Sequence, residues 1–497
     1  MKYSKLPIII DKTDLDSDKL TIYCGEECDC ACPDNGFSFN LTTDNKESKI
    51  VRPKLYSAHL TDEHSLFFNP ESDAGVVVLN SEAMDVLDLF KTPMLIDNVD
   101  VPVSSREAVI RMQSLGLLET EGSQLHIDKH EAKTLSIWLH VTNECNLRCD
   151  YCYINKTNEK MEHNVGFEAI DATLRSAVIG NFSRIKIKYA GGEATLNLPL
   201  VLELNEYAKT KSSELGLEFE SAVLSNGVAL SESSIKKLLE QNIRLMISLD
   251  GIGDGHDIQR KFINGKGSFE WVNRTINRTI ALGLKPFISI TVTDLNVDTL
   301  SETVGYILSK GLPFNINFYR DTECALNSQD LHLHDDRIIL AMNQVFKVIE
   351  ANLPAYTLLG MLIDRSSFGQ AHEKTCGVGE SYMVIDQKGD IAKCHMEIEK
   401  PITSIYQHDP LSFIRADSIG IQNLSVEEKE GCRDCEWRYW CTGGCPLLTY
   451  KTTGRYDVKS PYCRVYKSLY PGLLRLEGLR LLKYAKRTVE VAERLLV

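Results

Sequence analysis

At the centre of the chain lies the run Cys145–Asn146–Leu147–Arg148–Cys149–Asp150–Tyr151–Cys152–Tyr153. Its three thiols follow the spacing CxxxCxxC, which lets side chains of one short loop face a common point. Thiolates at this density are typical ligands of iron–sulfur clusters or of zinc. Three thiolates on a four-iron cluster leave one iron open to bind a further molecule, whereas an incomplete zinc site has the same spacing. The spacing alone leaves both alternatives open.

The 497 residues are 43% hydrophobic and 25% charged, which is an ordinary globular composition and long enough for several domains. The formal net charge of -14 disfavours a nucleic-acid binder, which usually has a basic surface. The apolar patch Leu6–Ile10 is too short for a signal peptide, and no apolar run approaches a membrane span. We therefore expect a cytoplasmic protein with neither nucleic acid nor a membrane as a partner.

Fifteen cysteines require an explanation, and in a reducing cytoplasm they indicate metal ligands rather than disulfides. They form groups: three in the central loop, Cys324 alone, seven from Cys376 to Cys463, and four near the N-terminus. Residues 1–50 form an N-terminal segment that carries this last group, Cys24, Cys28, Cys30 and Cys32. The group is either an extra iron–sulfur or zinc site or a reduced tail, and the sequence does not choose between them.

Residues 52–125 predict a small domain of strands and helices. Ser65–Phe68 and Val76–Leu79 are predicted strands around a turn, and Asn80 can cap a following helix. A second helix is predicted to open with a capping box at Ser104 and to stop at Gly116. A hairpin followed by helices is the plan of a winged helix.

The run from Phe68 to Asn80, the helix after it and Leu115–Leu118 resemble the RiPP recognition element. That winged-helix module captures the leader of a ribosomally made precursor peptide, so the resemblance implies such a peptide as a partner. An exposed strand edge next to a helix can accept an extended peptide as one more strand. A merely structural N-terminal domain is the alternative.

Residues 130–350 alternate between strands and helices. Leu135, Ile137, Leu139 and Val141 alternate with outward residues in a strand that leads into the cysteine loop. Five more strands are predicted at 185–189, 218–224, 244–249, 286–293 and 313–318, with helices such as 165–178 between them. Six such units predict an α/β fold, a parallel sheet curled into a partial (β/α)6 barrel. In barrels of this kind the chemistry lies at the C-terminal strand ends.

Polar motifs follow the second, third and fourth predicted strands. They are Gly191–Gly192–Glu193, then Ser225–Asn226–Gly227, then Ser248–Leu249–Asp250–Gly251 with Arg260 after it. Glycines let the backbone approach a ligand closely, and a carboxylate beside them can hold an ammonium group. Satisfied turn residues are the alternative for Asn226 and Asp250.

Together with the cysteine loop, these motifs resemble those of the radical S-adenosylmethionine (radical SAM) enzymes. The resemblance implies that Cys145, Cys149 and Cys152 hold a catalytic 4Fe–4S cluster whose open iron chelates S-adenosylmethionine (SAM). The implied SAM contacts are Gly191, Gly192 and Glu193 at the amino group, Ser248 and Arg260 at the carboxylate, Asn226 close by, and Tyr151 against the adenine, with Ser225 and Asp250 in the same motifs. This chain has Ala194 where family members usually have Pro.

The resemblance also implies the chemistry, which belongs to the cofactor while the protein supplies orientation. A one-electron reductant such as flavodoxin or ferredoxin reduces the cluster, and SAM is cleaved to methionine and a 5′-deoxyadenosyl radical. That radical abstracts hydrogen from an unactivated C–H bond. It must be kept from water, so we expect the barrel mouth to be covered.

The seven cysteines of residues 370–470 resemble the SPASM domain, which holds two auxiliary 4Fe–4S clusters, so the implied total is three. The implied outer ligands are Cys432, Cys435, Cys441 and Cys463, and the implied inner ligands are Cys376, Cys394 and Cys445. A zinc ribbon would need only four of the seven. Because no cysteine lies between Cys376 and Cys394, the inner cluster has an open iron or takes a ligand from elsewhere, such as Cys324, which otherwise is an ordinary buried cysteine.

Residues 471–497 predict one amphipathic helix starting at Leu473, and packing on its own protein is favoured over a membrane or partner contact. The whole pattern predicts a radical SAM/SPASM peptide maturase, an oxidoreductase that crosslinks a precursor peptide, with a thioether slightly preferred over a carbon–carbon bond. The alternatives are oxidation of a protein residue, as in sulfatase-maturating enzymes, or peptide epimerisation. A non-catalytic iron–sulfur scaffold or binding protein is the alternative outside enzymes.

Overall fold

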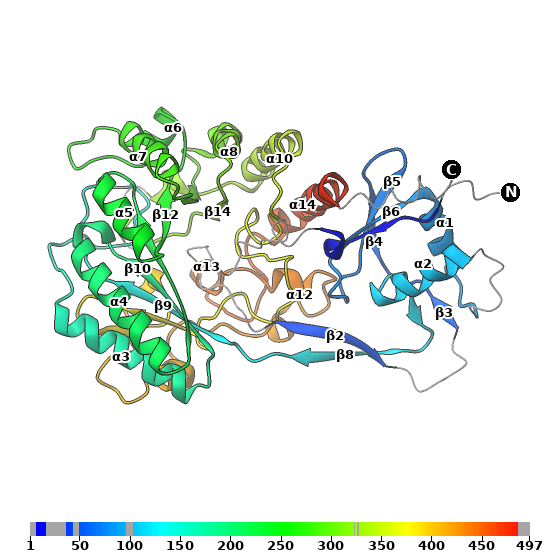
Figure 1. Cartoon of the computed structure of the whole chain (residues 1–497), viewed down its shortest axis with the longest axis horizontal. Coiled ribbons are helices and arrows are strands. Elements are labelled where there is room, and N and C mark those ends of the chain that lie inside the picture. Colours follow the sequence, from blue (N-terminus) through cyan, green and yellow to red (C-terminus); the bar gives the residue numbers. More distant parts are fainter. Residues whose placement is uncertain are drawn as a thin grey trace.

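The computed structural model describes residues 6–15, 36–42, 49–95, 103–322, 324–325 and 328–485. The predicted metal site at Cys24, Cys28, Cys30 and Cys32 lies outside these residues, as does the end of the tail after residue 485. Figure 1 shows an elongated chain with the α/β part at one end and the N-terminal sheet at the other. The cysteine-rich C-terminal part lies between them.

The central sheet has the strand order β14-β13-β12-β11-β10-β9-β15-β16-β17. Its first six strands in sequence pair in parallel with their neighbours and match the six predicted ones to within one residue at each end. The described strands do not close into a ring, so the predicted α/β partial barrel is confirmed. The six are β9 Thr134–His140, β10 Arg184–Ala190, β11 Glu218–Ser225, β12 Arg244–Ser248, β13 Phe287–Val292 and β14 Phe314–Phe318.

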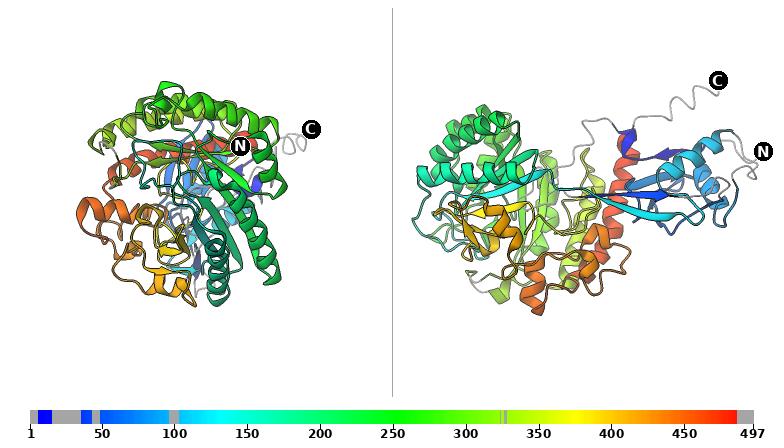
Figure 2. Two further views of the ribbon diagram at one scale, coloured as in Figure 1. Left: turned by 90° about the vertical axis from the view of Figure 1, so that its left-hand side faces the viewer. Right: turned by 90° about the horizontal axis from the view of Figure 1, so that it is seen from below.

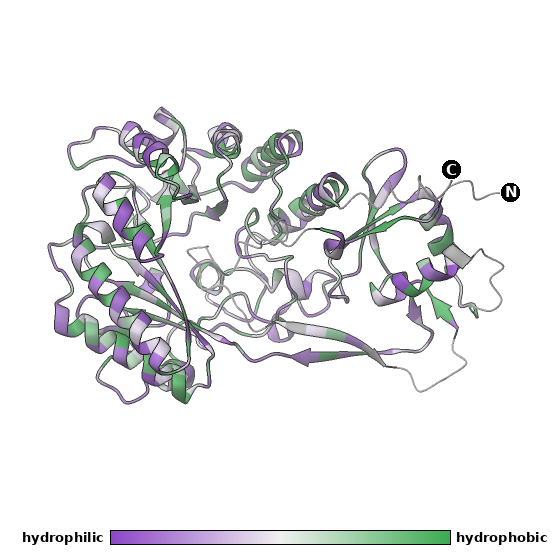
Figure 3. Cartoon of the chain, viewed as in Figure 1, coloured by the Kyte–Doolittle hydropathy of each residue, from purple (hydrophilic) through white to green (hydrophobic). Residues whose placement is uncertain are grey.

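Helices cover the outer side of this sheet (Figure 1). Alternate strand residues such as Leu135, Ile137 and Ile187 are buried in the core that the sheet shares with them. Figure 3 shows hydrophobic and hydrophilic bands alternating along these helices, as expected when one helix face is buried. They are α3 His163–Ile179, α4 Leu198–Glu214, α5 Glu232–Glu240, α6 Asp254–Asp257, α7 Phe269–Ala281, α8 Leu300–Ser309, α9 Ser328–Leu331 and α10 Asp335–Ala351.

A strand from the cysteine-rich part joins the barrel sheet. β15 (Tyr382–Ile385) pairs in parallel with β9, and β16 (Asp390–Ala392) and β17 (Thr403–Ser404) continue antiparallel. The sequence analysis did not predict this strand, because a four-residue apolar run carries no sign of its distant partner. The cysteine-rich part is therefore tied to the barrel by backbone hydrogen bonds. Its helices are α11 Pro410–Ala416, α12 Arg438–Cys441, α13 Pro446–Thr453 and α14 Cys463–Tyr484.

The N-terminal part holds an antiparallel sheet of order β1-β6-β5-β4, with β1 Ile9–Ile10, β4 Tyr56–His59, β5 His64–Phe68 and β6 Val76–Asn80. The predicted strands of this hairpin and the Asn80 cap of α1 (Ser81–Leu89) are confirmed, since the Asn80 side chain accepts from the Ala83 amide. Helix α2 (Val103–Ser114) already includes Ser104, so the predicted capping-box start there is wrong. Gly116 follows with φ 65°, as a stop signal requires. Short antiparallel pairs β2 (Phe37–Thr42) with β8 (Gln124–Lys129) and β3 (Ile50–Val51) with β7 (Glu119–Thr120) complete this part.

The C-terminal helix begins earlier than predicted. Helix α14 starts at Cys463 and continues through Pro471, so the predicted start at Leu473 is wrong and a boundary at 471 falls inside a helix. Pro471 normally ends or kinks a helix, but buried Tyr470 and Leu474 on either side hold this one together. Figure 2 shows α14 against the N-terminal sheet, where Gly478 approaches Leu60 and Leu66. The described part of the tail thus packs on its own protein, as predicted.

Among the helices of the described ranges, none combines the length and the apolar composition that crossing a membrane requires.

Candidate active site and cysteine centres

The three central cysteines lie in the loop that follows β9. Cys145 is buried, and Cys149 and Cys152 are partly buried. The Cys145 sulfur accepts hydrogen bonds from the Leu147 amide at 3.4 Å and from the Asn226 side chain at 3.8 Å. Burial raises the pKa of Cys149 to about 12, against the opposing effect of the Arg260 guanidinium. A bound metal cluster would hold these sulfurs as thiolates and reverse that balance.

Lys156 is a neighbour of these thiols that the sequence analysis missed. Burial lowers the pKa of the Lys156 ammonium, but the hydrogen bond and charge of Cys152, with Cys149 and Cys145 nearby, raise it overall. A cation held beside three thiolates suits an anionic cluster. Because Lys156 lies outside the cysteine motif, its position beside the thiols can be recognised only in the folded structure.

The glycine pair at the end of β10 packs against the start of the cysteine loop. The Gly192 amide donates to the Thr142 carbonyl at 2.7 Å, and the Glu193 amide donates to the Glu144 carbonyl at 2.8 Å. A Cβ atom on Gly192 would lie 2.4 Å from the Glu144 oxygen, and one on Gly191 would lie 2.5 Å from the Thr142 oxygen. The close approach that the glycines permit is therefore to the protein's own backbone, and it holds the loop on the sheet.

Glu193 joins the second and third motifs. Its buried carboxylate accepts hydrogen bonds from the Asn226 amide at 2.6 Å, the Ser225 hydroxyl at 2.9 Å and the Thr195 amide at 3.1 Å. The Thr195 hydroxyl donates to it as well. Burial raises the pKa of Glu193, and these hydrogen bonds oppose the rise. The carboxylate orders the ends of β10 and β11 and can attract a ligand's ammonium group.

Tyr151, Asp250 and Arg260 form a buried polar group. The Asp250 carboxylate accepts from the Tyr151 hydroxyl at 2.6 Å and from the Thr291 amide at 2.9 Å. Arg260 lies 3.6 Å from Asp250 and donates to the Tyr151 hydroxyl, with its guanidinium 5.9 Å from the centre of that ring. Gln259 adds a further hydrogen bond to Asp250 at 3.0 Å.

This group retains one unused donor. Among the described residues the buried Arg260 Nε has no hydrogen-bond partner. A buried donor of this kind costs free energy unless a bound ligand accepts its hydrogen bond. A carboxylate is the acceptor that a guanidinium fits best. Ser248 is half-buried at the end of β12, one strand from Ser225 and Asn226. The structure thus brings all the predicted SAM contacts to the C-terminal ends of β9 to β12.

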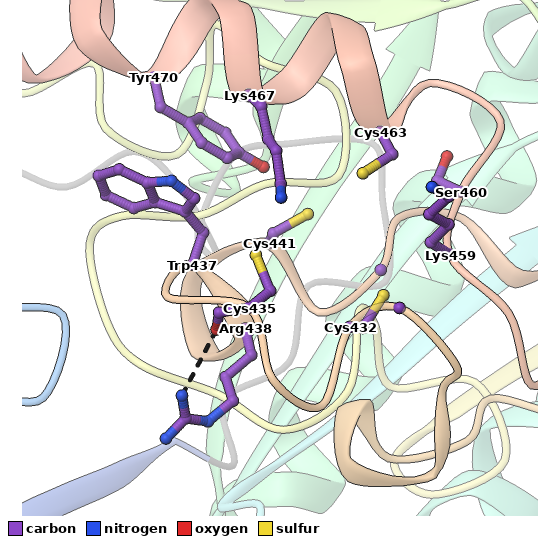
Figure 4. Close-up of a pocket in the computed structure, with 12 residues that line it drawn as sticks. Cys432, Cys435, Trp437, Arg438, Cys441, Lys459, Ser460, Cys463, Lys467 and Tyr470 are labelled. Carbon is purple, nitrogen blue, oxygen red and sulfur yellow. Dashed lines mark hydrogen bonds between the residues drawn. The ribbon is translucent and has the colours of Figure 1, made fainter.

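Four cysteines of the C-terminal part line one cavity, and Figure 4 shows them pointing into it. They are Cys432, Cys435, Cys441 and Cys463, the predicted outer ligands. Burial raises the pKa of Cys432 to about 12. A Cβ atom on Gly443 would lie 3.3 Å from the Cys432 sulfur, so the glycine keeps the space beside that sulfur free of a side chain. Lys467 and Tyr470 of α14 also line this cavity.

A second cavity is lined by the predicted inner ligands Cys376, Cys394 and Cys445. Burial raises the pKa of Cys376 to about 11 and that of Cys394 to about 12. Arg320 lines the same cavity and pairs with the buried Asp364 at 2.5 Å. Cys324 is half-buried and is not among the residues that line this cavity.

No three His, Cys, Asp or Glu side chains among the described residues converge on a point as ligands of a single ion do. Zinc needs its sulfur ligands about 2.3 Å from one centre. A four-iron cluster meets each thiolate with a different iron, so its ligands lie further apart. A four-iron cluster therefore does not require the convergence of ligands that a zinc ion does.

Aromatic side chains connect the central loop to the inner cavity. The His395 ring stacks on Trp138 with centroids 4.5 Å apart, meets the Tyr153 ring at 5.5 Å, and lies 3.1 Å from the Tyr382 hydroxyl. Tyr153 directly follows Cys152, and His395 directly follows Cys394. The sequence analysis missed Trp138 and Tyr382, since only the pairing of β15 with β9 brings them here.

Comparison with known proteins agrees with this geometry. Residues 139–307 match the model of the radical SAM superfamily. An uncharacterized protein of Methanocaldococcus jannaschii is 32% identical over 175 residues, covering 35% of this chain and 58% of that protein. The Fe-coproporphyrin III synthase of Methanosarcina barkeri is 26% identical over 235 residues, covering 46% of this chain and 55% of that protein. The chain thus spans little more than half the length of these two relatives.

A solved structure described as native anSMEcpe with bound AdoMet and Cp18Cys peptide is similar at TM-score 0.57 and 19% identity. The match covers 73% of this chain and 99% of that one, and it shows a shared fold. The family match runs from the end of β9 past β13 and so includes the cysteine loop, the glycine pair and Arg260. The chain therefore contains a radical SAM domain.

Proposed function

We propose that this chain is a radical SAM peptide maturase that removes hydrogen from a ribosomally made precursor peptide and installs a crosslink. In this proposal residues 52–125 capture the peptide, residues 130–350 hold SAM and its cluster, and residues 370–470 hold two auxiliary clusters. When bound, SAM and its cluster supply the radical that takes a hydrogen atom from the peptide. A one-electron reductant such as flavodoxin or ferredoxin is the second partner.

The residues around the central loop support SAM as the ligand. The Glu193 carboxylate and the unused Arg260 Nε offer opposite charges to the two ends of an amino acid. The Tyr151 hydroxyl and Asp250 orient the guanidinium from the other side. The amino-acid end of SAM is a zwitterion with an ammonium and a carboxylate group, so this pair of charges fits it.

The observation that carries the proposal is the two cysteine-lined cavities beyond the barrel. Crosslinking removes two hydrogens, the first as an atom and the second as a proton and an electron. The electron needs an acceptor close to the barrel, and the inner cavity meets this need because His395 and Tyr153 connect it with the cysteine loop. Three cysteines without a fourth in that lining favour a thioether, since an open iron binds a substrate thiolate.

The N-terminal sheet supports a peptide as the substrate. It contacts the outer cysteine cavity, where the Trp440 indole donates to the Pro70 carbonyl at 2.9 Å and Arg438 pairs with Glu71 at 2.9 Å. Trp437, which lines that cavity, stacks on Phe68 of β5 with centroids 5.9 Å apart. A peptide held by this sheet is therefore adjacent to the part of the chain that the clusters occupy. The anSMEcpe structure, of the same fold, contains a bound peptide.

The test is anaerobic reconstitution with iron and sulfide, reduction, and measurement of 5′-deoxyadenosine from added SAM. The Cys149→Ala variant should produce none, whereas the Cys324→Ser control should produce as much as the unchanged protein. Co-expression with a short peptide encoded beside the gene should then show a loss of two hydrogens by mass spectrometry. No SAM cleavage would favour the iron–sulfur scaffold, and SAM cleavage without a peptide mass change would favour epimerisation. Oxidation of one peptide residue without a crosslink is the runner-up, distinguished by fragmentation.

A further inference from the structure

The chain's own segment Leu6–Leu15 lies along the open edge of β6. Ile9 pairs with Leu79 and Ile10 pairs with Val78 in antiparallel register. The Asn80 side chain accepts from the Ile8 amide at 2.8 Å and donates to the Leu6 carbonyl at 2.9 Å, and the Asn80 amide donates to the Ile8 carbonyl at 3.2 Å. These contacts bind only the backbone of the segment, so any extended peptide could make them.

The side chains of the segment are bound selectively. Ile9 is 7% exposed and is buried in the core formed by β6 with α1 and α2, while Ile10 faces the opposite side of the sheet. Arg111 of α2 pairs with the Asp11 carboxylate at 2.9 Å and with the Asp14 carboxylate at 2.5 Å. The β6 edge and Arg111 together therefore accept two aliphatic residues, then a carboxylate, then a second carboxylate three residues later.

The position is the one that a captured peptide requires. β5 already pairs with β6 on one side, so the edge that β1 occupies is the side of β6 left for a further strand. Helix α2 contributes Arg111 beside that edge, which matches a strand edge next to a helix. In the proposed function a precursor leader needs such an edge, and here the chain's own segment holds it.

We propose that the β6 edge is a peptide-docking site that residues 6–15 occupy intramolecularly, and that a precursor leader with the same aliphatic-pair-then-carboxylate pattern displaces them. The identity of the displacing peptide rests on the proposed function, whereas the docking edge does not. An attached occupant has a high effective concentration, so it excludes peptides that lack the full pattern. The segment thus sets the minimum affinity that a leader peptide needs in order to bind.

The buried side chains of Ile9, Ile10, Asp11 and Leu15 anchor the segment, so exchange is feasible for a peptide that replaces them, because the backbone is held less firmly. Only two of its residues pair with β6, and Leu6 is 43% exposed. The Arg111 side chain is 38% exposed, so water and a competing carboxylate can reach its ion pairs. The Asp11 side chain is only 3% exposed and that of Asp14 16%, so salt should weaken mainly the Asp14 pair and speed exchange moderately at high ionic strength.

The experiment uses a fluorescein-labelled synthetic peptide with the sequence of residues 6–15 and measures its binding by fluorescence anisotropy. The full chain should bind the probe weakly. A full-length Asp11→Lys/Asp14→Lys variant has a weakened internal occupant and should bind it at least tenfold more tightly. A chain that begins at residue 16 should bind equally tightly, and circular dichroism verifies that both are folded.

Adding Arg111→Glu to the chain that begins at residue 16 should abolish binding of the natural probe. The same variant should bind a probe with lysine in place of both aspartates, because the charges are then exchanged and no internal segment competes. A folded double variant that binds no more tightly than the unchanged chain would overturn the proposal, as would binding that ignores Arg111. Binding of the probe requires neither SAM nor clusters. A protein that binds the probe but does not cleave SAM would therefore refute the proposed function and leave the docking-site proposal supported.

Discussion

Gly192→Ala tests whether the glycine pair serves to hold the cysteine loop on the sheet. The new Cβ atom would lie 2.4 Å from the Glu144 carbonyl oxygen and 2.6 Å from that of Asn143. Both neighbours are backbone atoms, which cannot rotate away as a flexible side chain could. The loop must therefore move, and the hydrogen bond from the Gly192 amide to Thr142 lengthens with it.

The cost follows from two effects. Overpacking a site with rigid neighbours costs about 1–3 kcal/mol. Weakening the Gly192–Thr142 hydrogen bond adds about 0.5–1.5 kcal/mol. We therefore expect Gly192→Ala to lower the free energy of unfolding by about 2–4 kcal/mol. The displaced loop should also bind less iron, because Cys145 follows Glu144 directly and Cys149 and Cys152 lie in the same loop.

The measurement is urea denaturation of the anaerobic protein followed by circular dichroism, with iron content determined in parallel. Gly305→Ala is the matched control, since its Cβ would meet only the Val348 side chain at an ordinary 3.4 Å inside helix α8. Removing a helical glycine there should stabilise the protein by about 0.4–1 kcal/mol. A Gly192→Ala protein with an unchanged urea midpoint and full iron content would refute the reasoning.

Three further predictions concern buried groups. Burial lowers the pKa of His140 from 6.5 to about 4, so below pH 6.5 the unfolded chain gains a proton that the folded chain does not. The free energy of unfolding should therefore be about 1.4 kcal/mol lower at pH 5.5 than at neutral pH. In the His140→Gln variant the urea midpoint should depend less on pH between 7.5 and 5.5. Cys432→Ala should lose the iron of one four-iron cluster, whereas Cys324→Ser should lose none, as measured by iron analysis. Lys156→Met removes a cation beside Cys152, so the reduction potential of the radical SAM cluster should become more negative, as measured by an EPR-monitored redox titration. The control Lys160→Met removes a lysine whose partner is Glu144 and should leave that potential unchanged.

Local pattern in the chain was enough to predict the partial barrel. The alternation of Leu135, Ile137 and Leu139 specifies a strand with one buried face, and the polar motifs mark where each strand stops. Because parallel strands end at one edge of a sheet, those motifs had to lie near one another. The same logic located the hairpin around residues 69–73 and the Asn80 cap.

Contacts between distant segments were beyond such reasoning. β15 has four residues, and nothing in them indicates that they extend the sheet beside β9, 240 residues earlier. Lys156, Trp138 and Tyr382 acquire their neighbours only through that assembly, as does the occupant of the β6 edge. Helix α14 also continues through Pro471 because buried neighbours outweigh the local preference of that residue.

The amino-acid sequence alone specified the strand pattern of the α/β fold and the presence of grouped thiol ligands, because hydrophobic period and ligand type are local properties. Where each thiol lies, which carboxylate meets which guanidinium and what covers the β6 edge were decided by folding. Those contacts join residues that are far apart in the chain, and only packing of the whole determines them.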